Sequence, residues 1–309
     1  MSTAVKIKGL VKNYNGVFAV NNLDLSVPEG SIYGFLGSNG AGKTTTLKMI
    51  IGMTEPTAGE IEIMGKKVVF GSNEFIDVIG YLPDVPGFYD WMTPKEFLHF
   101  SGGLYDMSKE EIIKRTKELL ELVNLKKVQN RKIGTFSRGM KQRLGIAQAL
   151  INNPKVVLLD EPVSALDPIG RKEVMDIIQS LAGKVTVFFS THILADVERI
   201  CDRIIIINEG KKLLEDSIEH IKEVPDIRTL DIECENEEDA KIFEDFAKHE
   251  SIDHVEIDKF RVAIFGSDID QMRHLVSGLL YERKVYVKKI QVREVSLEDI
   301  FIKVVNGNA

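Results

Sequence analysis

A glycine-rich segment near the start of the chain has the residue types of a phosphate-binding loop. It runs Gly37-Ser-Asn-Gly-Ala-Gly-Lys43-Thr44 and matches the pattern GxxxxGK[ST]. Glycines let the backbone curl so that its N–H groups face phosphate oxygens, Lys43 reaches the β- and γ-phosphates, and the Thr44 hydroxyl is a ligand for Mg²⁺. A chance glycine turn is the alternative, but the segment lies between a strand-like run, 31–37, and a run with helical spacing, 44–51. We therefore expect the phosphates of a nucleotide to contact Gly37, Ser38, Asn39, Gly40, Ala41, Gly42, Lys43, Thr44 and Thr45.

Two adjacent carboxylates end an apolar run later in the chain. Residues 156–159 are apolar and are followed by Asp160 and Glu161. If this strand ends at the phosphate loop, Asp160 faces the Mg²⁺ and Glu161 points to the other side, where it can orient or deprotonate a water that attacks the γ-phosphate. An apolar strand that ends in Asp-Glu is common by itself. Beside a phosphate loop, the pattern predicts nucleotide hydrolysis.

Three further segments stand in a definite order around this strand. The segment 135–143, Thr-Phe-Ser-Arg-Gly-Met-Lys-Gln-Arg, precedes an apolar helix that leads to the Asp160 strand. Ser-Ala-Leu-Asp follows at 164–167, and Ser-Thr-His follows another strand at 190–192. This combination resembles the nucleotide-binding domain of ATP-binding cassette (ABC) transporters, over residues of about 4–215. The combined motifs are highly specific for that family.

The resemblance implies roles for residues that would otherwise carry little meaning. Tyr14 stacks on adenine, and His192 contacts the γ-phosphate. Ser137 and Gly139 lie in the signature loop, which in this family contacts the ATP bound to the opposite protomer. Asp167 closes the D-loop. A single Tyr or His at such places is ordinarily structural, so only the position relative to the other motifs supports these roles.

One segment imitates the signature loop. Phe100-Ser-Gly-Gly-Leu is closer to the family's LSGGQ than Phe136-Ser-Arg-Gly-Met is. The signature must, however, cap the helix that feeds the Asp160 strand, which only the later segment does. The earlier segment is predicted to end a helix that begins at Pro94. We therefore assign the signature serine to Ser137.

Two residues depart from the family pattern. Arg138 replaces the first glycine of the signature, a change found in drug- and antibiotic-export subfamilies. Asp84 stands where the family usually has a glutamine that ligates Mg²⁺ and senses the permease. A carboxylate is also a hard oxygen donor, so the predicted metal ligands are Thr44, Asp84 and Asp160. Asp84 also adds a negative charge near Glu161.

Composition excludes several classes of protein. The 309 residues are 44% hydrophobic and 28% charged, which is typical of a folded globular chain. The two cysteines cannot form a disulfide framework, and no apolar run approaches the roughly 20 residues of a membrane span. The first residues have charges within their apolar part, unlike a signal peptide, so a cytoplasmic location is expected. Residues 216–309 hold 22 Asp and Glu against 13 Lys and Arg, which argues against nucleic acid as a partner.

The pattern of elements predicts an α/β chain with two domains. Short alternating strands open the chain, a helical insertion covers about 85–148, and strands then alternate with helices, which favours a mostly parallel sheet. With the resemblance, this is a P-loop NTPase (RecA-like) core with an N-terminal antiparallel β subdomain and a helical insertion in residues 1–215. Residues 216–309 form a small α+β C-terminal domain with the element order βαββαβ, which is ferredoxin-like, and a last helix from Ser296. A helix is expected over 237–249.

The predicted function is that of an ATPase subunit of an ABC transporter, with ATP and Mg²⁺ as cofactors. The resemblance implies a homodimer with two-fold symmetry that closes on ATP, and separate membrane permease subunits that hold it at the inner face of the cell membrane. Export is favoured by resemblance only. A non-transport ABC ATPase of translation or DNA maintenance is the alternative, and a nucleotide-binding regulator without turnover is a third. The C-terminal domain either packs or dimerises, or binds a regulatory ligand.

Overall fold

The computed structural model describes residues 2–223, 228–244, 246, 249, 251–266, 268–293 and 297. The chain divides into two compact units, Met1–Ile218 and Glu219–Gly307, and each is described by itself. The predicted helix from Ser296 lies outside the described residues, apart from Leu297. In the described part of the chain, no helix has the length and hydropathy needed to cross a membrane.

The first unit opens with an antiparallel sheet, as predicted. Its strands β1 (Thr3–Tyr14), β2 (Val17–Pro28), β4 (Ala58–Ile63) and β5 (Lys66–Lys67) lie in the order β2-β1-β4-β5. Asn15 and Gly16 join β1 to β2 and both have positive φ, at 51° and 95°. Asn-Gly is the residue pair that a tight two-residue hairpin turn prefers, so the turn chemistry sets this pairing locally.

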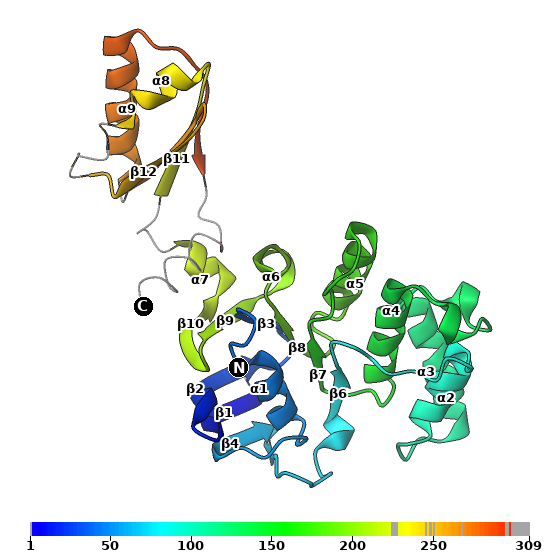
Figure 1. Cartoon of the computed structure of the whole chain (residues 1–309). Helices are drawn as coiled ribbons and strands as arrows, with labels where there is room; N and C mark the ends of the chain where they lie inside the picture. Colours follow the sequence, from blue (N-terminus) through cyan, green and yellow to red (C-terminus); the bar gives the residue numbers. More distant parts are fainter. Residues whose placement is uncertain are drawn as a thin grey trace. The chain divides into compact units, whose positions relative to one another are not determined.

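A six-stranded sheet forms the centre of the first unit (Figure 1). Its order is β10 (Lys211–Ser217), β9 (Arg203–Asn208), β3 (Ile32–Gly37), β8 (Thr186–Thr191), β7 (Val156–Asp160) and β6 (Ile79–Leu82). All neighbours pair in parallel except β10, which is antiparallel to β9. Parallel strands end at one edge of a sheet, so the ends of β3, β7 and β8 are brought together there.

Helices occupy the connections between these strands. α1 (Lys43–Ile50) follows β3, α5 (Pro168–Ser180) follows β7, and α6 (Leu194–Ile200) follows β8. α7 (Ile218–Glu223) follows β10, the last strand of the sheet in the chain, and all but its first residue belong to the second unit. Short 3₁₀ turns cover Ile76–Val78, Lys126–Val128 and Ile133–Thr135. The alternation of strand and helix confirms the predicted α/β core.

The helical insertion contains α2 (Pro94–Gly102), α3 (Lys109–Leu122) and α4 (Arg138–Ala149). Thr93 with Glu96, and Ser108 with Glu111, form the reciprocal hydrogen bonds of capping boxes at the starts of α2 and α3. Figure 1 shows α2 and α3 to one side of the central sheet, beyond α4. α2 ends at Gly102, so the prediction that the Phe100 segment ends a helix is confirmed.

The second unit is one antiparallel sheet with helices on one face. Its elements are β11 (Arg228–Cys234), α8 (Glu237–Lys241), β12 (His254–Asp258), β13 (Arg261–Gly266), α9 (Ile269–Arg283) and β14 (Val287–Arg293), with strand order β12-β13-β11-β14. A core that includes Ile232, Phe243 and Met272 joins the helices to one face of the sheet. α8 is shorter than the helix expected over 237–249, because the chain turns after Lys241.

Candidate functional site

A cavity of about 370 Å³ opens where β3, β7 and β8 end. Residues from the phosphate loop, the carboxylate strand and the histidine segment meet there, although Asn39 and His192 are 153 positions apart in the chain. Two lining residues, Ala19 and Ser164, were not predicted. The lining residues are Ala19, Asn39, Gly40, Gly42, Lys43, Thr44, Thr45, Asp84, Glu161, Ser164 and His192.

The phosphate loop depends on glycine for a steric reason. Gly40 and Gly42 have φ of 83° and 105°, which residues with a Cβ rarely adopt. A Cβ on Gly42 would also lie 2.2 Å from the carbonyl oxygen of Ala19. α1 begins at the next residue, so its first N–H groups and positive dipole end face the cavity. The loop can therefore surround an anion.

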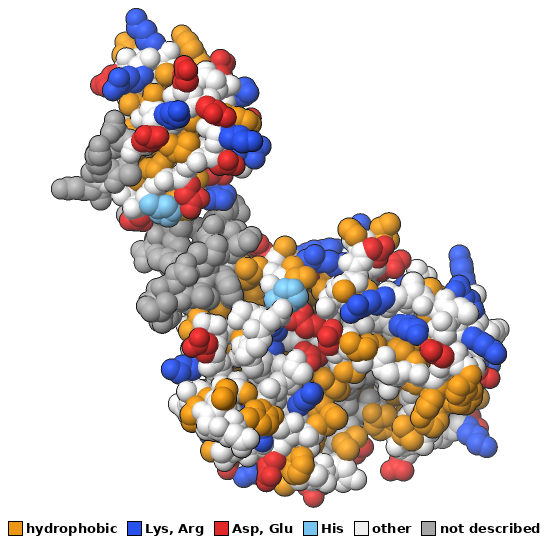
Figure 2. All heavy atoms as spheres, in the orientation of Figure 1, with side chains coloured by type: hydrophobic (Ala, Val, Ile, Leu, Met, Phe, Trp, Pro, Cys, Tyr) orange, Lys and Arg blue, Asp and Glu red, His pale blue; other side chains and the backbone are white. Residues whose placement is uncertain are grey.

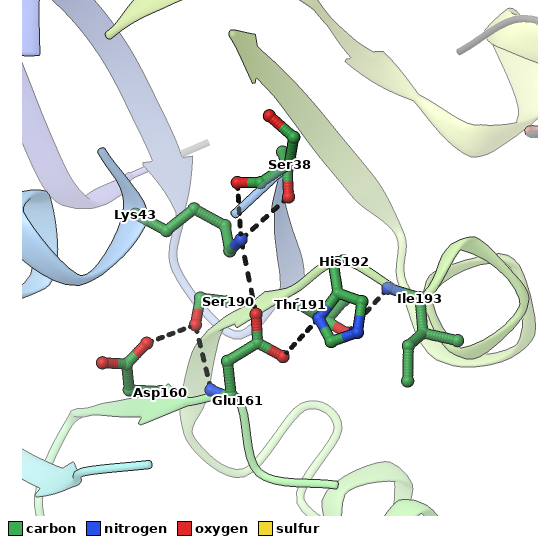
Figure 3. A network of polar contacts seen from close by, with 9 residues as sticks. Ser38, Lys43, Asp160, Glu161, Ser190, Thr191, His192 and Ile193 are labelled. Carbon is green, nitrogen blue, oxygen red and sulfur yellow. Dashed lines mark hydrogen bonds and ion pairs between the residues drawn. The ribbon is translucent and has the colours of Figure 1, made fainter. Parts of the chain in front are cut away.

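Lys43 lies almost fully buried at this loop, with only 6% of its side chain exposed. Its ammonium donates to the carbonyl oxygens of Gly37 at 2.8 Å and Ser38 at 3.2 Å. It also lies 3.3 Å from Oε1 of Glu161, as Figure 3 shows. The cation is thus held between the loop and the carboxylate that follows β7.

Glu161 is fixed from three directions. Its backbone N–H donates to Ser190 Oγ at 3.0 Å, Oε1 faces Lys43, and Oε2 lies 3.0 Å from Nδ1 of His192. Its φ of 47° is in the left-handed region, where glutamate is uncommon. Such strained backbone persists only where the surroundings hold it, and it concentrates at functional sites. The carboxylate is therefore preorganised at the cavity wall.

Ser190 is a functional residue of the histidine segment for which the sequence predicted no role. Its hydroxyl donates to Asp160 Oδ1 at 2.6 Å and accepts from the backbone N–H of Glu161 at 3.0 Å. It therefore holds the carboxylate of Asp160 and the backbone of Glu161 at the strand end (Figure 3). Its place at the end of an apolar strand, two residues before His192, was the available signal.

Asp160 is 1% exposed and lies behind the cavity wall. Burial raises the pKa of this carboxyl above its ordinary value; hydrogen bonds from Ser190 and Thr44 oppose the rise, and the charges of Glu161 and Asp84 add to it. The folded chain thus holds this proton more tightly than the unfolded chain does. The free energy of unfolding consequently falls as the pH rises through the raised pKa.

We expect Asp160→Asn to raise the midpoint of thermal unfolding near neutral pH, because the amide removes a buried charge and keeps an oxygen to accept from Ser190. The difference in unfolding midpoint between the variant and the wild type should shrink as the pH is lowered, since the wild-type carboxyl then becomes neutral as well. Scanning calorimetry across a pH series, without nucleotide, measures both. Asp77→Asn is the control, because Asp77 is exposed and does not line the cavity. A destabilised Asp160→Asn protein would contradict this account.

The oxygen donors of the cavity suit Mg²⁺. Thr44 and Asp84 line the cavity, and Asp160 is hydrogen-bonded to Thr44. Among the described residues no group of three or more His, Cys, Asp and Glu forms a metal site. Mg²⁺ commonly takes only one or two protein carboxylates and completes its shell with phosphate oxygens and water. A hydroxyl with carboxylates beside a phosphate loop is such a donor set.

Four residues assigned from the resemblance do not line this cavity. Tyr14 ends β1 with 49% of its surface exposed, and Lys12 Nζ lies 5.0 Å from its ring centre. Ser137 is the N-cap of α4 and accepts from the Met140 N–H, with Gly139 in the first turn of that helix. Asp167 caps α5. The structure therefore does not bring Tyr14, Ser137, Gly139 and Asp167 to the phosphate loop of their own chain.

Comparison with known proteins supplies independent information about this arrangement. The profile of the ABC transporter family matches residues 20–164. The bacitracin transport ATP-binding protein BcrA of Bacillus licheniformis is 39% identical over 309 residues, covering 99% of each chain. The Nod factor export ATP-binding protein I of Burkholderia lata is 33% identical and covers 97% of this chain and 96% of its own.

Solved structures agree with the fold of the first unit. The structure of an ATP-binding subunit of an ABC transporter is 31% identical, with a TM-score of 0.65 over 71% of this chain and 92% of that one. An ATP-binding cassette solved as a dimer, in a post-hydrolysis state with ADP and phosphate, is 30% identical. Its TM-score is 0.63 over 69% of this chain and 98% of its own.

Proposed function

This chain belongs to the ABC transporter family, and from that premise we propose that it is the ATPase subunit of an exporter that works with separate membrane permease subunits. One observation carries the proposal: Lys43, Glu161 and His192 converge at one cavity beside the phosphate loop. Phosphoryl transfer to water uses a cation, a base and a second polar group that holds the base. Lys43, Glu161 and His192 can fill these roles in that order. A regulator without turnover would need Lys43 to bind the nucleotide, but it has no need of a base that is held by His192.

Hydrolysis follows from the contacts of these three residues. Backbone N–H groups of loop 37–44 and the Lys43 ammonium bind phosphate oxygens, which compete with Glu161 for the lysine. Glu161, still held by His192, can then accept the proton of a water whose oxygen attacks the γ-phosphorus. The bond from that phosphorus to the β-phosphate oxygen breaks, and ADP and phosphate result. Thr44, Asp160 and Asp84 would hold Mg²⁺, which would neutralise phosphate charge when bound.

The active unit in this proposal is a pair of chains. Ser137 is exposed at the start of α4 and lies outside its own chain's cavity, so it is available to the ATP of another copy. Two copies related by a two-fold axis can each supply Ser137 and Gly139 to the partner's nucleotide. The related cassette that was solved as a dimer supports this arrangement. Tyr14 is proposed to contact the adenine.

An exposed apolar patch on the helical insertion is the proposed permease site. Figure 2 shows hydrophobic side chains gathered over the region where Figure 1 places α2 to α4. Tyr89 contacts both Trp91, at 5.8 Å between ring centres, and Phe100, at 5.6 Å. Phe88 instead packs on Phe97 in the interior of the insertion. The three contacting residues Tyr89, Trp91 and Phe100 are exposed, as are Val85 and Leu104 in the same stretch of the chain.

We expect Trp91→Ala and Tyr89→Ala each to weaken permease binding about tenfold or more, because exposed aromatic side chains commonly dominate interface energies. Trp91 is 66% exposed and Tyr89 47%, so the isolated subunit should keep its fold and ATPase activity. Co-purification with the permease, alongside ATPase assays of the subunit alone, measures the two effects. Ile113→Ala is the control, because Ile113 is an exposed apolar residue of α3. Full permease binding by both variants would place the docking site elsewhere.

The binding site for the transported compound belongs to the permease, so the names of the relatives indicate only the direction and class of transport. Their names concern bacitracin transport and Nod factor export, which supports a product moved outward from the cytoplasm. The proposed location is the inner face of the membrane, through the permease. Purification of this chain with a membrane protein would support the proposal. Purification with ribosomes or DNA instead would favour the non-transport alternative.

A further inference from the structure

The sheet of the second unit has a second face, opposite the one that packs on α8 and α9. Strand register arranges its side chains in rows across the four strands, in the order β12, β13, β11, β14. The middle row is Glu256, Ala263, Asp231 and Gln291, and the next row is Asp258, Arg261, Glu233 and Lys289. A hollow of about 390 Å³ lies among these two rows, with the small Ala263 within it.

The charges on this face are sorted by strand. The edge strand β12 contributes Glu256 and Asp258, whereas the opposite edge strand β14 contributes Lys289 and Arg293. Some charges are used within the chain: Arg293 Nε lies 3.5 Å from Asp231 Oδ2. The far end of the face is closed by Phe265, on which His254 stacks at 4.0 Å.

The last row is different, because its charges form no ion pair with the residues that the structure describes. Asp258, Arg261, Glu233 and Lys289 alternate in sign along the row, yet none of them makes an ion pair with another described residue. Three of the four are exposed and Glu233 is half-buried. Alternating charges that remain unpaired in one copy are free to pair with a second surface.

We propose that this face pairs with the same face of a second copy of the chain, about a two-fold axis parallel to the strands. Such an axis reverses the strand order, so β12 of one copy lies over β14 of the other, and β13 lies over β11. Asp258 then faces Lys289, and Arg261 faces Glu233. Symmetry makes each pair occur twice. The face is thus complementary to itself.

The other in-plane axis, across the strands, is excluded by charge. It would place β12 on β12 and β14 on β14, so that Glu256 faces Glu256 and the basic residues of β14 face one another. Like charges brought together in this way are repulsive. Side chains of Arg, Lys and Glu are long enough to meet across the roughly 10 Å that separates packed sheets.

The contact area is small, so the contact supplements the proposed ATP-dependent pair of chains. Four strands spaced about 4.8 Å apart form a narrow face, well below the area of a stable interface. By itself it is weak and dependent on salt. Two chains already held together through nucleotide raise the effective concentration of the faces, so the contact adds to the proposed ATP-dependent pair. The inference goes beyond the proposed function, and it can be wrong while that function is right.

Cross-linking of single-cysteine variants tests the predicted orientation. Glu256 and Gln291 face each other across the proposed axis, whereas the excluded axis pairs each with itself. We mix full-length Glu256→Cys and Gln291→Cys chains, without nucleotide and at low salt, with a bismaleimide that spans about 10 Å. The native Cys201 and Cys234 are buried and do not compete. We expect the mixed product well above the level given by Tyr281→Cys, which is 87% exposed on α9 and measures collision.

Charge reversal tests the cause of the pairing. Lys289→Glu, or Asp258→Lys, is introduced into both cysteine variants. Each change should lower the yield of the mixed cross-linked product about tenfold, because two symmetry-related contacts become repulsive. The double change Asp258→Lys with Lys289→Glu should restore it, since the charges are exchanged but still complementary. Each variant is checked for its unfolding midpoint, which should not change because both residues are exposed.

Three results would overturn the proposal. They are a mixed yield no higher than collision, a dominant product that links two Glu256→Cys chains to each other as in the excluded axis, and failure of the double change to restore the yield. None depends on ATP hydrolysis. An inactive but cross-linked chain would therefore refute the ATPase assignment and leave this contact standing.

Discussion

Glu161→Gln is expected to lower the rate of ATP hydrolysis by about 10²–10⁴-fold while leaving ATP bound. The amide cannot accept the proton of the attacking water, although it has nearly the same shape as the carboxylate. Lys43 keeps its bonds to the carbonyl oxygens of Gly37 and Ser38, and the glycine loop is unchanged. Binding and hydrolysis should therefore separate in this variant.

The chain provides a matched control for this change. Glu209 has a φ of 48°, close to the 47° of Glu161, but it does not line the cavity. Glu209→Gln thus has the same chemistry on the same backbone conformation and should hydrolyse ATP normally. Phosphate release measures the rate, and equilibrium dialysis with ATP measures binding. A Glu161→Gln protein with a near wild-type rate would show that another group is the base.

The same variant reports on pairing of the two chains. If hydrolysis reopens the proposed dimer, Glu161→Gln should accumulate as a dimer with ATP and Mg²⁺ and remain a monomer with ADP. Size-exclusion chromatography with light scattering distinguishes the two. Adding Ser137→Ala should reduce the dimer, because Ser137 is proposed to contact the partner's nucleotide. A Glu161→Gln chain that never dimerises with ATP would argue against the shared site.

Lys43→Ala is expected to lower affinity for ATP about 10–100-fold, because it removes a charge-assisted contact in a desolvated position. Only 6% of the Lys43 side chain is exposed, so bulk water screens its charge weakly. Hydrolysis should also be lost, since the phosphates are no longer held beside Glu161. Titration calorimetry with ATP and Mg²⁺ measures the affinity.

Lys48→Ala is the control for this variant. Lys48 lies in the last turn of α1 and is exposed, so its loss changes the same helix without touching the cavity. Lys43 also bonds two backbone carbonyls, and the unfolding midpoint of Lys43→Ala must therefore be compared with wild type. Unchanged ATP affinity in a folded Lys43→Ala protein would count against the phosphate-loop assignment.

Local features of the sequence predicted much of the first unit. The capping boxes at Thr93 and Ser108 mark the starts of α2 and α3 because their hydrogen bonds join residues only three apart. The buried strands and the glycine loop could be predicted for the same reason, because their patterns are also local in the sequence. The family resemblance, the α/β fold and the ATPase activity are confirmed by the comparisons. The second unit was predicted less well where helix periodicity over 237–249 continued past the actual turn at Lys241.

The sequence by itself therefore determined the elements and the residue types of the site. Which residues touch was decided only by the tertiary structure, because β3, β7 and β8 come together through long-range parallel pairing. That pairing places Ser190 between Asp160 and Glu161, and Glu161 between Lys43 and His192. Ala19 reaches the cavity from β2, a contact that no local pattern encodes. Spacing along the chain specifies turns and helices, whereas the closing of a catalytic site depends on contacts between distant strands.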